Sequence, residues 1–207
     1  TVTEEGTKNV LKAAQEVGVK RVVHLSTVEV YGNVAGLIDE SSPLKYSGNE
    51  YADSKVNAEK LCQEYQAKGL SIVILRPTVV YGPFGKVWTI LIAERLLSGC
   101  WKLPRHLSGL VQPVYIDDLV SAVFLALEKN SAAGEAFNIA GSEVLSWDEF
   151  FRQFNAALGL PPLKVQSHLF ALSRTVSITP LRSLARYAMA SHPELLKKVV
   201  NALHLEY

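Results

Sequence analysis

Cysteine is scarce in this sequence of 207 residues, and the two present, Cys62 and Cys100, follow no metal-ligand spacing. They form no disulfide framework, so we expect free thiols in a reducing, cytoplasmic environment. An excess of charge is lacking too, because 21 Lys and Arg residues against 20 Asp and Glu residues leave a formal net charge of +1. This balance gives no electrostatic reason to expect a nucleic-acid partner.

Long apolar runs are also missing. No stretch approaches the ~20 apolar residues that a membrane-spanning helix needs. Residues 1–8 are polar and carry two glutamates, unlike a secretory signal peptide. The chain opens directly in a helix-forming run without a preceding strand, so we expect it to continue a fold that begins upstream.

Apolar periodicity predicts helices that alternate with strands. Helical spacing covers residues 4–17, 50–68, 87–97, 119–128 and 147–158, and short apolar runs at 21–26, 71–75, 114–116 and 136–140 predict strands. Continuous apolar strands that alternate with helices are typical of a parallel sheet covered on both faces. The predicted fold class is α/β, with a partial doubly wound, Rossmann-like parallel sheet and a small, mostly helical C-terminal lobe.

That lobe is expected over residues 159–207. The chain is broken at Pro161-Pro162, and the segment that follows is helical in composition and basic. Such a charge bias usually marks a solvated helix face. Contact of the basic tail with an acidic partner or a membrane surface is the less favoured alternative.

The sharpest chemical feature is Tyr51-Ala-Asp-Ser-Lys55, within the helix predicted over residues 50–68. Residues four apart share one helix face, with Cβ atoms about 5–6 Å apart. The Lys55 ammonium is therefore expected to lower the pKa of Tyr51, which is ~10 when unperturbed. Tyr51 would then act as a general acid/base near neutral pH. The spacing alone is a weak signal, since surface helices show it by chance.

Two further segments converge on the same predicted sheet edge. Ser26-Thr27 follows the first buried strand, and Arg76-Pro77 closes the second strand before an apolar turn. Ligands of open parallel sheets bind beyond the carboxyl ends of the strands. A hydroxyl, a tyrosine–lysine pair and an apolar turn at one edge favour a catalytic site over chance.

Together these segments resemble the extended short-chain dehydrogenase/reductases, which include the NAD-dependent epimerase/dehydratases. His24 to Gly32 is similar to the family's hydroxyl-bearing strand end, Tyr51 to Glu59 to its active-site helix, and Leu75 to Pro83 to the turn that packs on nicotinamide. The resemblance covers residues 4 to 158. It implies that residues 1–158 form the later part of an NAD(P)-binding Rossmann-like domain, with substrate-lobe segments interleaved.

The resemblance also implies roles for the matching residues. Thr27 would polarise the oxygen of a small-molecule substrate, and Tyr51 would transfer the proton, assisted by Lys55. The residues implied to contact NAD or NADP are Ser26, Tyr51, Lys55, Pro77, Thr78, Val79 and Val80. No metal ligand is implied. Because family members often pair through the active-site helix, the resemblance implies a homodimer.

One element of the family is absent from the sequence. No G-x-G-x-x-G or G-x-x-G-x-x-G turn, which cradles pyrophosphate at a helix N-terminus, occurs in it. We therefore expect roughly 90 residues, three βα units, upstream of Thr1, and an unpaired edge on the strand at 21–26. These residues alone are expected to bind dinucleotide poorly and to show little activity, and the choice between NAD and NADP is left open.

The substrate region departs from the nucleotide-sugar members. No arginine lies between Gly109 and Tyr115, where those members usually bind the diphosphate, and Ala52 stands in place of a glycine. Both features favour apolar alcohols and ketones, as in hydroxysteroid-dehydrogenase-like or dihydroflavonol-reductase-like enzymes. Val28 beside Glu29, where sugar dehydratases keep an aspartate, argues against 4,6-dehydration.

The expected function is thus hydride transfer at a secondary alcohol or ketone by an NAD(P)-dependent oxidoreductase. A nucleotide-sugar epimerase is the alternative enzyme, and a non-catalytic binding or scaffold module is the alternative of another class. Asp117 and Asp118 are expected to cap a helix that begins at Leu119. Arg76 is expected to pair with an acid or to cap a strand end.

Overall fold

The computed structural model describes residues 2–104 and 107–165. The chain forms two compact units, each built from two segments: unit 1 comprises Thr1–Thr78 and Asp117–Ala140, and unit 2 comprises Val79–Ile116 and Gly141–Tyr207. The polypeptide therefore passes from one unit to the other three times, at 78–79, 116–117 and 140–141.

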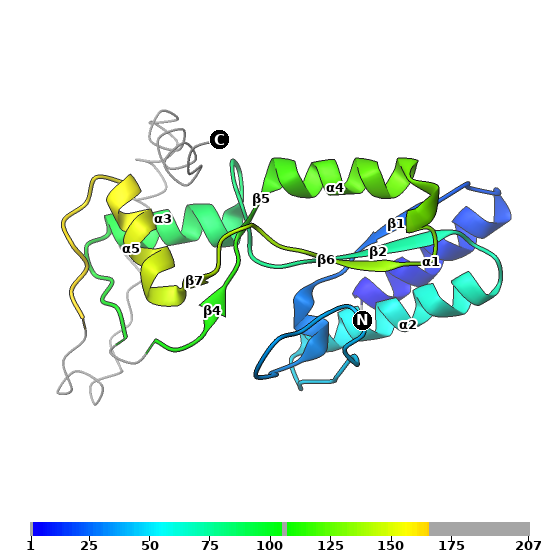
Figure 1. The fold of residues 1–207 in the computed structure, drawn as a ribbon, viewed down its shortest axis with the longest axis horizontal. Coiled ribbons are helices and arrows are strands. Elements are labelled where there is room, and N and C mark those ends of the chain that lie inside the picture. Colours follow the sequence, from blue (N-terminus) through cyan, green and yellow to red (C-terminus); the bar gives the residue numbers. More distant parts are fainter. Residues whose placement is uncertain (1, 105–106, 166–207) are drawn as a thin grey trace. The chain divides into compact units, whose positions relative to one another are not determined.

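Unit 1 contains a parallel sheet in the order β1-β2-β6. Its strands are β1 (Val22–Leu25), β2 (Ile72–Pro77) and β6 (Ala136–Ile139). Helices α1 (Val2–Glu16) and α2 (Glu50–Ala67) cover one face, and α4 (Ile116–Glu128) covers the other (Figure 1). This arrangement confirms the predicted α/β class and the parallel sheet. Within the described residues β1 pairs only with β2, so the expected strand edge is present.

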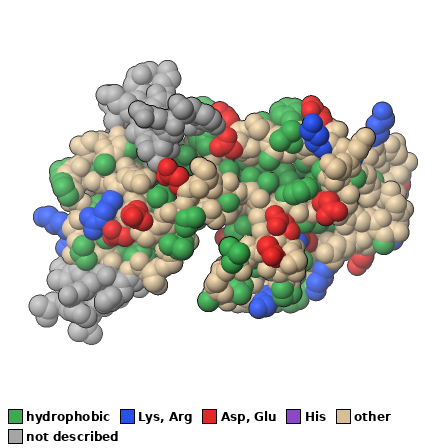
Figure 2. Space-filling model, viewed as in Figure 1, with side chains coloured by type: hydrophobic (Ala, Val, Ile, Leu, Met, Phe, Trp, Pro, Cys, Tyr) green, Lys and Arg blue, Asp and Glu red, His purple; other side chains and the backbone are tan. Residues whose placement is uncertain are grey.

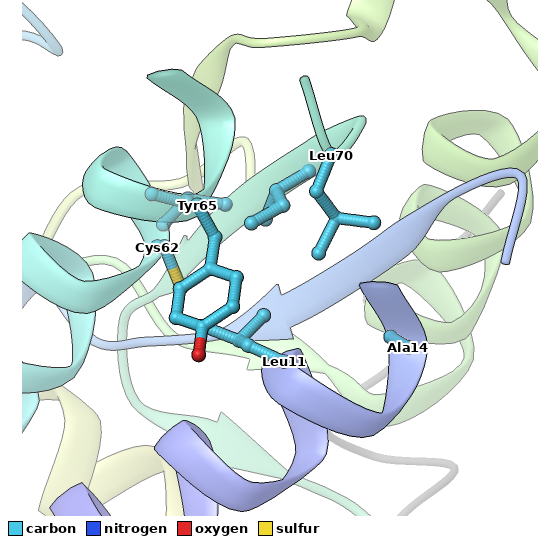
Figure 3. Close-up of a cluster of buried hydrophobic side chains, with 7 residues drawn as sticks. Leu11, Ala14, Cys62, Tyr65 and Leu70 are labelled. Carbon is cyan, nitrogen blue, oxygen red and sulfur yellow. The ribbon is translucent and has the colours of Figure 1, made fainter. Parts of the chain in front are cut away.

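The central strand β2 is buried along its whole length, which explains its run of four apolar residues, Ile72 to Leu75. Successive side chains of a strand point to opposite faces. Ile72 and Ile74 therefore pack toward α1 and α2, in a cluster that also contains Leu11, Ala14, Cys62, Tyr65 and Leu70 (Figure 3). Val73 and Leu75 face the other way, toward a cluster that includes Ala122, Val123 and Ala126 of α4.

The outer side of α4 is apolar as well. Its exposed side chains include Val120, Phe124, Leu125 and Leu127. Figure 2 shows hydrophobic side chains at the surface of unit 1 in the region of this helix. The C-terminal end of α4 is held by Arg21, whose guanidinium donates to the carbonyl oxygens of Ala126, Leu127 and Lys129.

Unit 2 contains the helices α3 (Leu91–Leu97) and α5 (Trp147–Ala157) and four strands of two residues each. Strands β3 (Val80–Tyr81) and β5 (Val114–Tyr115) pair in parallel, whereas β4 (Leu110–Val111) and β7 (Leu145–Ser146) pair antiparallel. The core of this unit is a cluster of buried apolar side chains from α3, β4 and α5: Ile92, Ala93, Leu96, Val111, Phe150 and Phe154. Ser146 and Glu149 form a capping box that begins α5.

The structure corrects several predicted boundaries. Helix α4 begins at Ile116, so Asp117 and Asp118 lie in its first turn and do not cap a helix starting at Leu119. Carboxylates there favour the positive end of the helix dipole, so their contribution is still structural. The helix predicted over 87–97 opens with a π-helical turn, Lys86–Ile90.

The expected C-terminal lobe falls largely outside the described residues, which end at 165. In the part that is described, Val165 forms a β-bridge with Leu103. Among residues 2–104 and 107–165, no helix is both long enough and apolar enough to cross a bilayer.

Candidate active site

The start of α2 fixes Tyr51 at the edge of unit 1. The Asn49 side chain caps the helix, accepting hydrogen bonds from the backbone N–H of Tyr51 at 2.9 Å and of Ala52 at 3.2 Å. The Asp53 carboxylate in turn holds the preceding turn, accepting from the backbone N–H of Ser47 and of Gly48. Tyr51 is 51% exposed, so its phenol is accessible although its backbone is well anchored.

Lys55 lies one turn further along the same helix face. Its Nζ is 6.0 Å from the centroid of the Tyr51 ring and donates a 2.8 Å hydrogen bond to the carbonyl oxygen of Leu25, the last residue of β1. Burial lowers the pKa of Lys55, while the nearby Glu59 opposes that shift. Lys55 therefore ties the active-site helix to the end of the first strand.

Thr27 follows that strand and is buried, with 7% of its surface exposed. It caps the 3-10 helix Val28–Tyr31, where its hydroxyl accepts a hydrogen bond from the backbone N–H of Glu29 at 3.3 Å. The Thr27 hydroxyl also lies near enough to the Tyr51 phenol to lower the pKa of that phenol. The structure thus brings Thr27, Tyr51 and Lys55 together, although they come from separate segments.

The acidity of Tyr51 differs from the sequence-based expectation. Burial raises the pKa of Tyr51 above its usual value of 10.0, the charge of Glu29 raises it further, and the nearby Thr27 hydroxyl acts in the opposite direction. The predicted lowering of this pKa by Lys55 is therefore wrong for this structure. The physical reason is that the ammonium is directed to a backbone carbonyl, whereas a carboxylate and apolar surroundings disfavour the phenolate.

Close to Thr27, Tyr51 and Lys55 lies a buried ion pair whose acidic partner was not predicted from the sequence. Glu59 is 0% exposed and receives hydrogen bonds from Arg76, with Nη2 to Oε2 at 2.7 Å and Nε to Oε1 at 3.0 Å. Its Oε1 also accepts a 2.5 Å hydrogen bond from the Ser26 hydroxyl. Burial acts against the charge of Arg76, but its bonds to Glu59 prevail and raise its pKa. Of the two roles left open for Arg76, pairing with an acid is the one that the structure shows.

The other side of Arg76 extends this network to the loop before α2. Its Nη1 donates to the Tyr31 hydroxyl at 2.7 Å, and that hydroxyl donates to Oδ1 of Asn138 at 2.8 Å. The backbone N–H of Asn138 donates to the carboxylate of Glu40 at 2.8 Å. A continuous chain of polar contacts therefore links the ends of β1, β2 and β6.

The four cofactor-contacting residues predicted at the end of the second strand are divided between the two units. Pro77 is buried within β2, and the backbone N–H of Thr78 donates to the carbonyl oxygen of Ile139. Val79 packs against the core of unit 2, and Val80 pairs with Val114 in β3 and β5. Pro77 and Thr78 thus belong to unit 1, and Val79 and Val80 to unit 2. Their contact with a cofactor stays a prediction.

His24 is a further polar group near the candidate site. Its Nε2 is buried and has no hydrogen-bond partner. Burial lowers its pKa from 6.5 to about 4, the charge of Lys55 adds to this shift, and the charge of Glu59 opposes it. His24 is therefore neutral at neutral pH and adds no positive charge beside Lys55.

Comparison with known proteins shows which family this chain resembles. The family model described as "NAD dependent epimerase/dehydratase family" matches residues 2–140. A 2-alkyl-3-oxoalkanoate reductase of Stenotrophomonas maltophilia is 33% identical over 165 residues, which are 75% of this chain and 50% of that protein. A UDP-glucose 4-epimerase of Vibrio cholerae is 28% identical over 167 residues, which are 77% of this chain and 50% of that protein. The chain spans about half the length of the curated relatives it matches.

Among solved structures, the fold is similar to that of DesIV, a dTDP-glucose 4,6-dehydratase from Streptomyces venezuelae crystallised with NAD and TYD bound. The TM-score is 0.67 at 26% identity, and the match covers 92% of this chain and 67% of DesIV. The match and the family model point to the same α/β architecture.

Proposed function

This chain belongs to the NAD-dependent epimerase/dehydratase family, and we propose that it carries the proton-transfer site of an enzyme that moves a hydride between NAD and a secondary alcohol or ketone. The observation that supports this most directly is the position of Lys55, whose Nζ lies 6.0 Å from the centroid of the Tyr51 ring and donates to the carbonyl oxygen of Leu25, two residues before Thr27. These groups lie beyond the carboxyl end of β1, where open parallel sheets bind their ligands.

Tyr51 is suited to give a proton to a substrate oxygen. Its raised pKa keeps the phenol protonated at neutral pH, so in the reduction of a ketone it supplies the proton that the developing alkoxide needs. Thr27 is buried and held by Glu29, which gives its hydroxyl a fixed position next to the phenol. Thr27 therefore orients the same substrate oxygen toward Tyr51.

The donor set of the site fits the nicotinamide-ribose end of NAD. The hydroxyls of Tyr51 and Thr27 and the ammonium of Lys55 offer donors that a ribose diol can accept from. When bound, NAD exchanges a hydride with the carbon that carries the substrate oxygen. Lys55 would hold the ribose through its ammonium group.

We propose apolar alcohols and ketones as the substrate class. The segment from Gly109 to Tyr115 contains no arginine to meet a diphosphate. The reductase relative from Stenotrophomonas maltophilia, whose name specifies a 2-alkyl-3-oxoalkanoate, supports this choice. Nucleotide-sugar epimerisation is the second candidate, because the Vibrio cholerae relative of similar coverage is a UDP-glucose 4-epimerase.

The test uses the full-length protein with NAD or NADH and four probes: a 2-alkyl-3-oxoalkanoate, a ketosteroid, UDP-glucose and dTDP-glucose. We expect NADH oxidation with a ketone probe, and a loss of about 10²–10⁴-fold in turnover for Tyr51→Phe. Tyr46→Phe is the matched control, because Tyr46 is an exposed tyrosine of the adjacent loop whose hydroxyl contacts Asn57 and Lys60.

Full turnover by Tyr51→Phe would contradict the proton-transfer role. Turnover of UDP-glucose alone would select the epimerase. If no probe is turned over while NAD binds, the protein is a binding module, as the alternative of another class predicts.

A further inference from the structure

Three side chains of α2 follow one another along a single helix face at intervals of four residues: Tyr51, Lys55 and Glu59. Tyr51 is exposed and Lys55 is only partly buried, as an active site requires. The third, Glu59, lies wholly inside unit 1, with an exposed fraction of 0%. The proposed proton-transfer step uses the first two and leaves the third unexplained.

Glu59 is an unusual group to bury for stability alone. Removing a carboxylate and a guanidinium from water is expensive, and a well-packed apolar pair of similar volume is often as stable or more stable. The Glu59–Arg76 pair is instead fully engaged: Arg76 approaches both carboxylate oxygens, and Ser26 donates to Oε1. Because the Glu59 carboxylate is bonded in fixed directions to Arg76 and Ser26, we expect it to hold these residues in place more than it stabilises the fold.

The positions it defines are those of the candidate site. Ser26 immediately precedes Thr27, and Arg76 immediately precedes Pro77 at the end of β2. The Glu59 carboxylate thus joins the ends of β1 and β2 to the active-site helix, through bonds of 2.5 Å to Ser26 and 2.7 Å to Arg76. Any shift of this carboxylate would move the Thr27 hydroxyl relative to the Tyr51 phenol.

We propose that Glu59, held by Arg76, is a positioning residue that sets the distance between Thr27 and Tyr51 and places a negative charge one helical turn from the Lys55 ammonium. This inference rests on the proposed function. Because Glu59 is wholly buried, it acts only through Ser26, Arg76 and Lys55.

The charge part of this inference predicts a change at Lys55. The groups that act on the Lys55 ammonium are Glu59 and Cys62 on its own helix, and His24 interacts with it from β1. Tyr51 lies one turn before it. Burial lowers the pKa of Lys55 and Glu59 partly restores it, so loss of the Glu59 charge must lower it further.

The first experiment introduces the substitution Glu59→Gln into the full-length protein, with Glu64→Gln as the matched control. Glu64 is an exposed carboxylate on the same helix. On the probe that wild type turns over, we expect kcat to fall about 10–100-fold because the hydroxyl and phenol are displaced, with KM changed less than about twofold. The alkaline limb of the pH–rate profile should move to lower pH in Glu59→Gln and stay in place in Glu64→Gln.

A second measurement on the same variants follows the pKa of Lys55 and does not depend on turnover. NMR of the protein with ¹³C-labelled lysine, assigned with a Lys55→Arg variant, reports the pKa of Lys55 directly. A lower Lys55 pKa in Glu59→Gln than in wild type supports the proposal. An unchanged Lys55 pKa overturns its charge part.

The second experiment separates positioning from stability. In a double variant, Glu59→Met with Arg76→Met, the buried pair becomes apolar, so the melting temperature should stay near that of wild type or rise. We expect kcat to remain at least tenfold below wild type, because nothing then fixes Ser26 and Thr27. Wild-type kcat in this folded double variant would show that the pair is only structural and would overturn the proposal.

Tyr51→Phe distinguishes the two levels of inference. If Tyr51→Phe and both Glu59 variants are fully active, the proposed function itself is wrong. If Tyr51→Phe is inactive and the folded double variant is fully active, the proposed function holds and only the positioning role fails.

Discussion

Acidification is expected to destabilise unit 1 through His24. Its Nε2 is buried without a partner, and its pKa is lowered from 6.5 to about 4 in the folded protein, chiefly by burial. The unfolded chain accepts this proton near the ordinary pKa, so below pH 6.5 it binds more protons than the folded state. The stabilisation is fully present above pH 6.5 and is lost as the pH falls toward 4.

The size of the effect follows from the same shift. Each pH unit within this window removes up to about 1.4 kcal/mol of the free energy of unfolding. The ceiling for this residue is about 3 kcal/mol, which is a large part of the ~5–15 kcal/mol of a typical domain. His24→Phe removes the titrating group while keeping a ring of similar shape, so its stability should depend less on pH over this window.

The assay is urea unfolding at several pH values between 6.5 and 4 and above 6.5, followed by far-ultraviolet circular dichroism. The three tryptophans, Trp88, Trp101 and Trp147, all belong to unit 2, so tryptophan fluorescence reports that unit separately. Wild type should lose stability faster than His24→Phe as the pH falls. Parallel losses in the two proteins, or a histidine NMR titration that places His24 near pH 6.5, would refute the reasoning.

Three further perturbations test the packing. Cys100 is exposed and Cys62 is buried with its pKa raised to about 12 by burial, so a thiol reagent should label Cys100 in the native protein and Cys62 only after unfolding. Gly141→Ala would place a Cβ against the carbonyl oxygen of Pro113, and a destabilisation of about 1–3 kcal/mol should appear in the tryptophan-detected transition. Leu11→Ala, at a side chain that is 1% exposed, should cost about 2–5 kcal/mol in the transition detected by circular dichroism. An unchanged unfolding midpoint would contradict the prediction for Gly141→Ala or for Leu11→Ala. Labelling of Cys62 in the native protein would contradict the prediction for the thiols.

Apolar periodicity was sufficient to predict the long elements of unit 1. Helix α1 buries Leu11 and Ala14, three residues apart, and β2 begins with four buried apolar residues, Ile72 to Leu75. The two-residue strands β3, β4 and β7 were not predicted. A strand of two residues has no period, and its partner lies far away in the sequence.

The candidate site, like the fold, could be predicted from the sequence only in part. The convergence of Thr27, Tyr51 and Lys55 could be predicted, because the ends of neighbouring parallel strands meet at one edge. The burial of Glu59 could not, since a glutamate on a helix normally indicates a solvated face. One signal was available: Glu59 lies four residues after Lys55 on the face that carries Tyr51. The direction of the Tyr51 pKa shift depended on Glu29 and on burial, which only the structure shows.

The threefold passage of the chain between its two units has a consequence for recombination among relatives. Unit 2 is encoded by two stretches, residues 79–116 and the stretch that begins at Gly141, separated by the segment that forms α4 and β6. A single genetic crossover therefore cannot exchange this unit without also exchanging α4 and β6. A working chimera would need both stretches from the same donor, so amino-acid changes in the two should be inherited together, whereas α4 and β6 can remain those of the recipient.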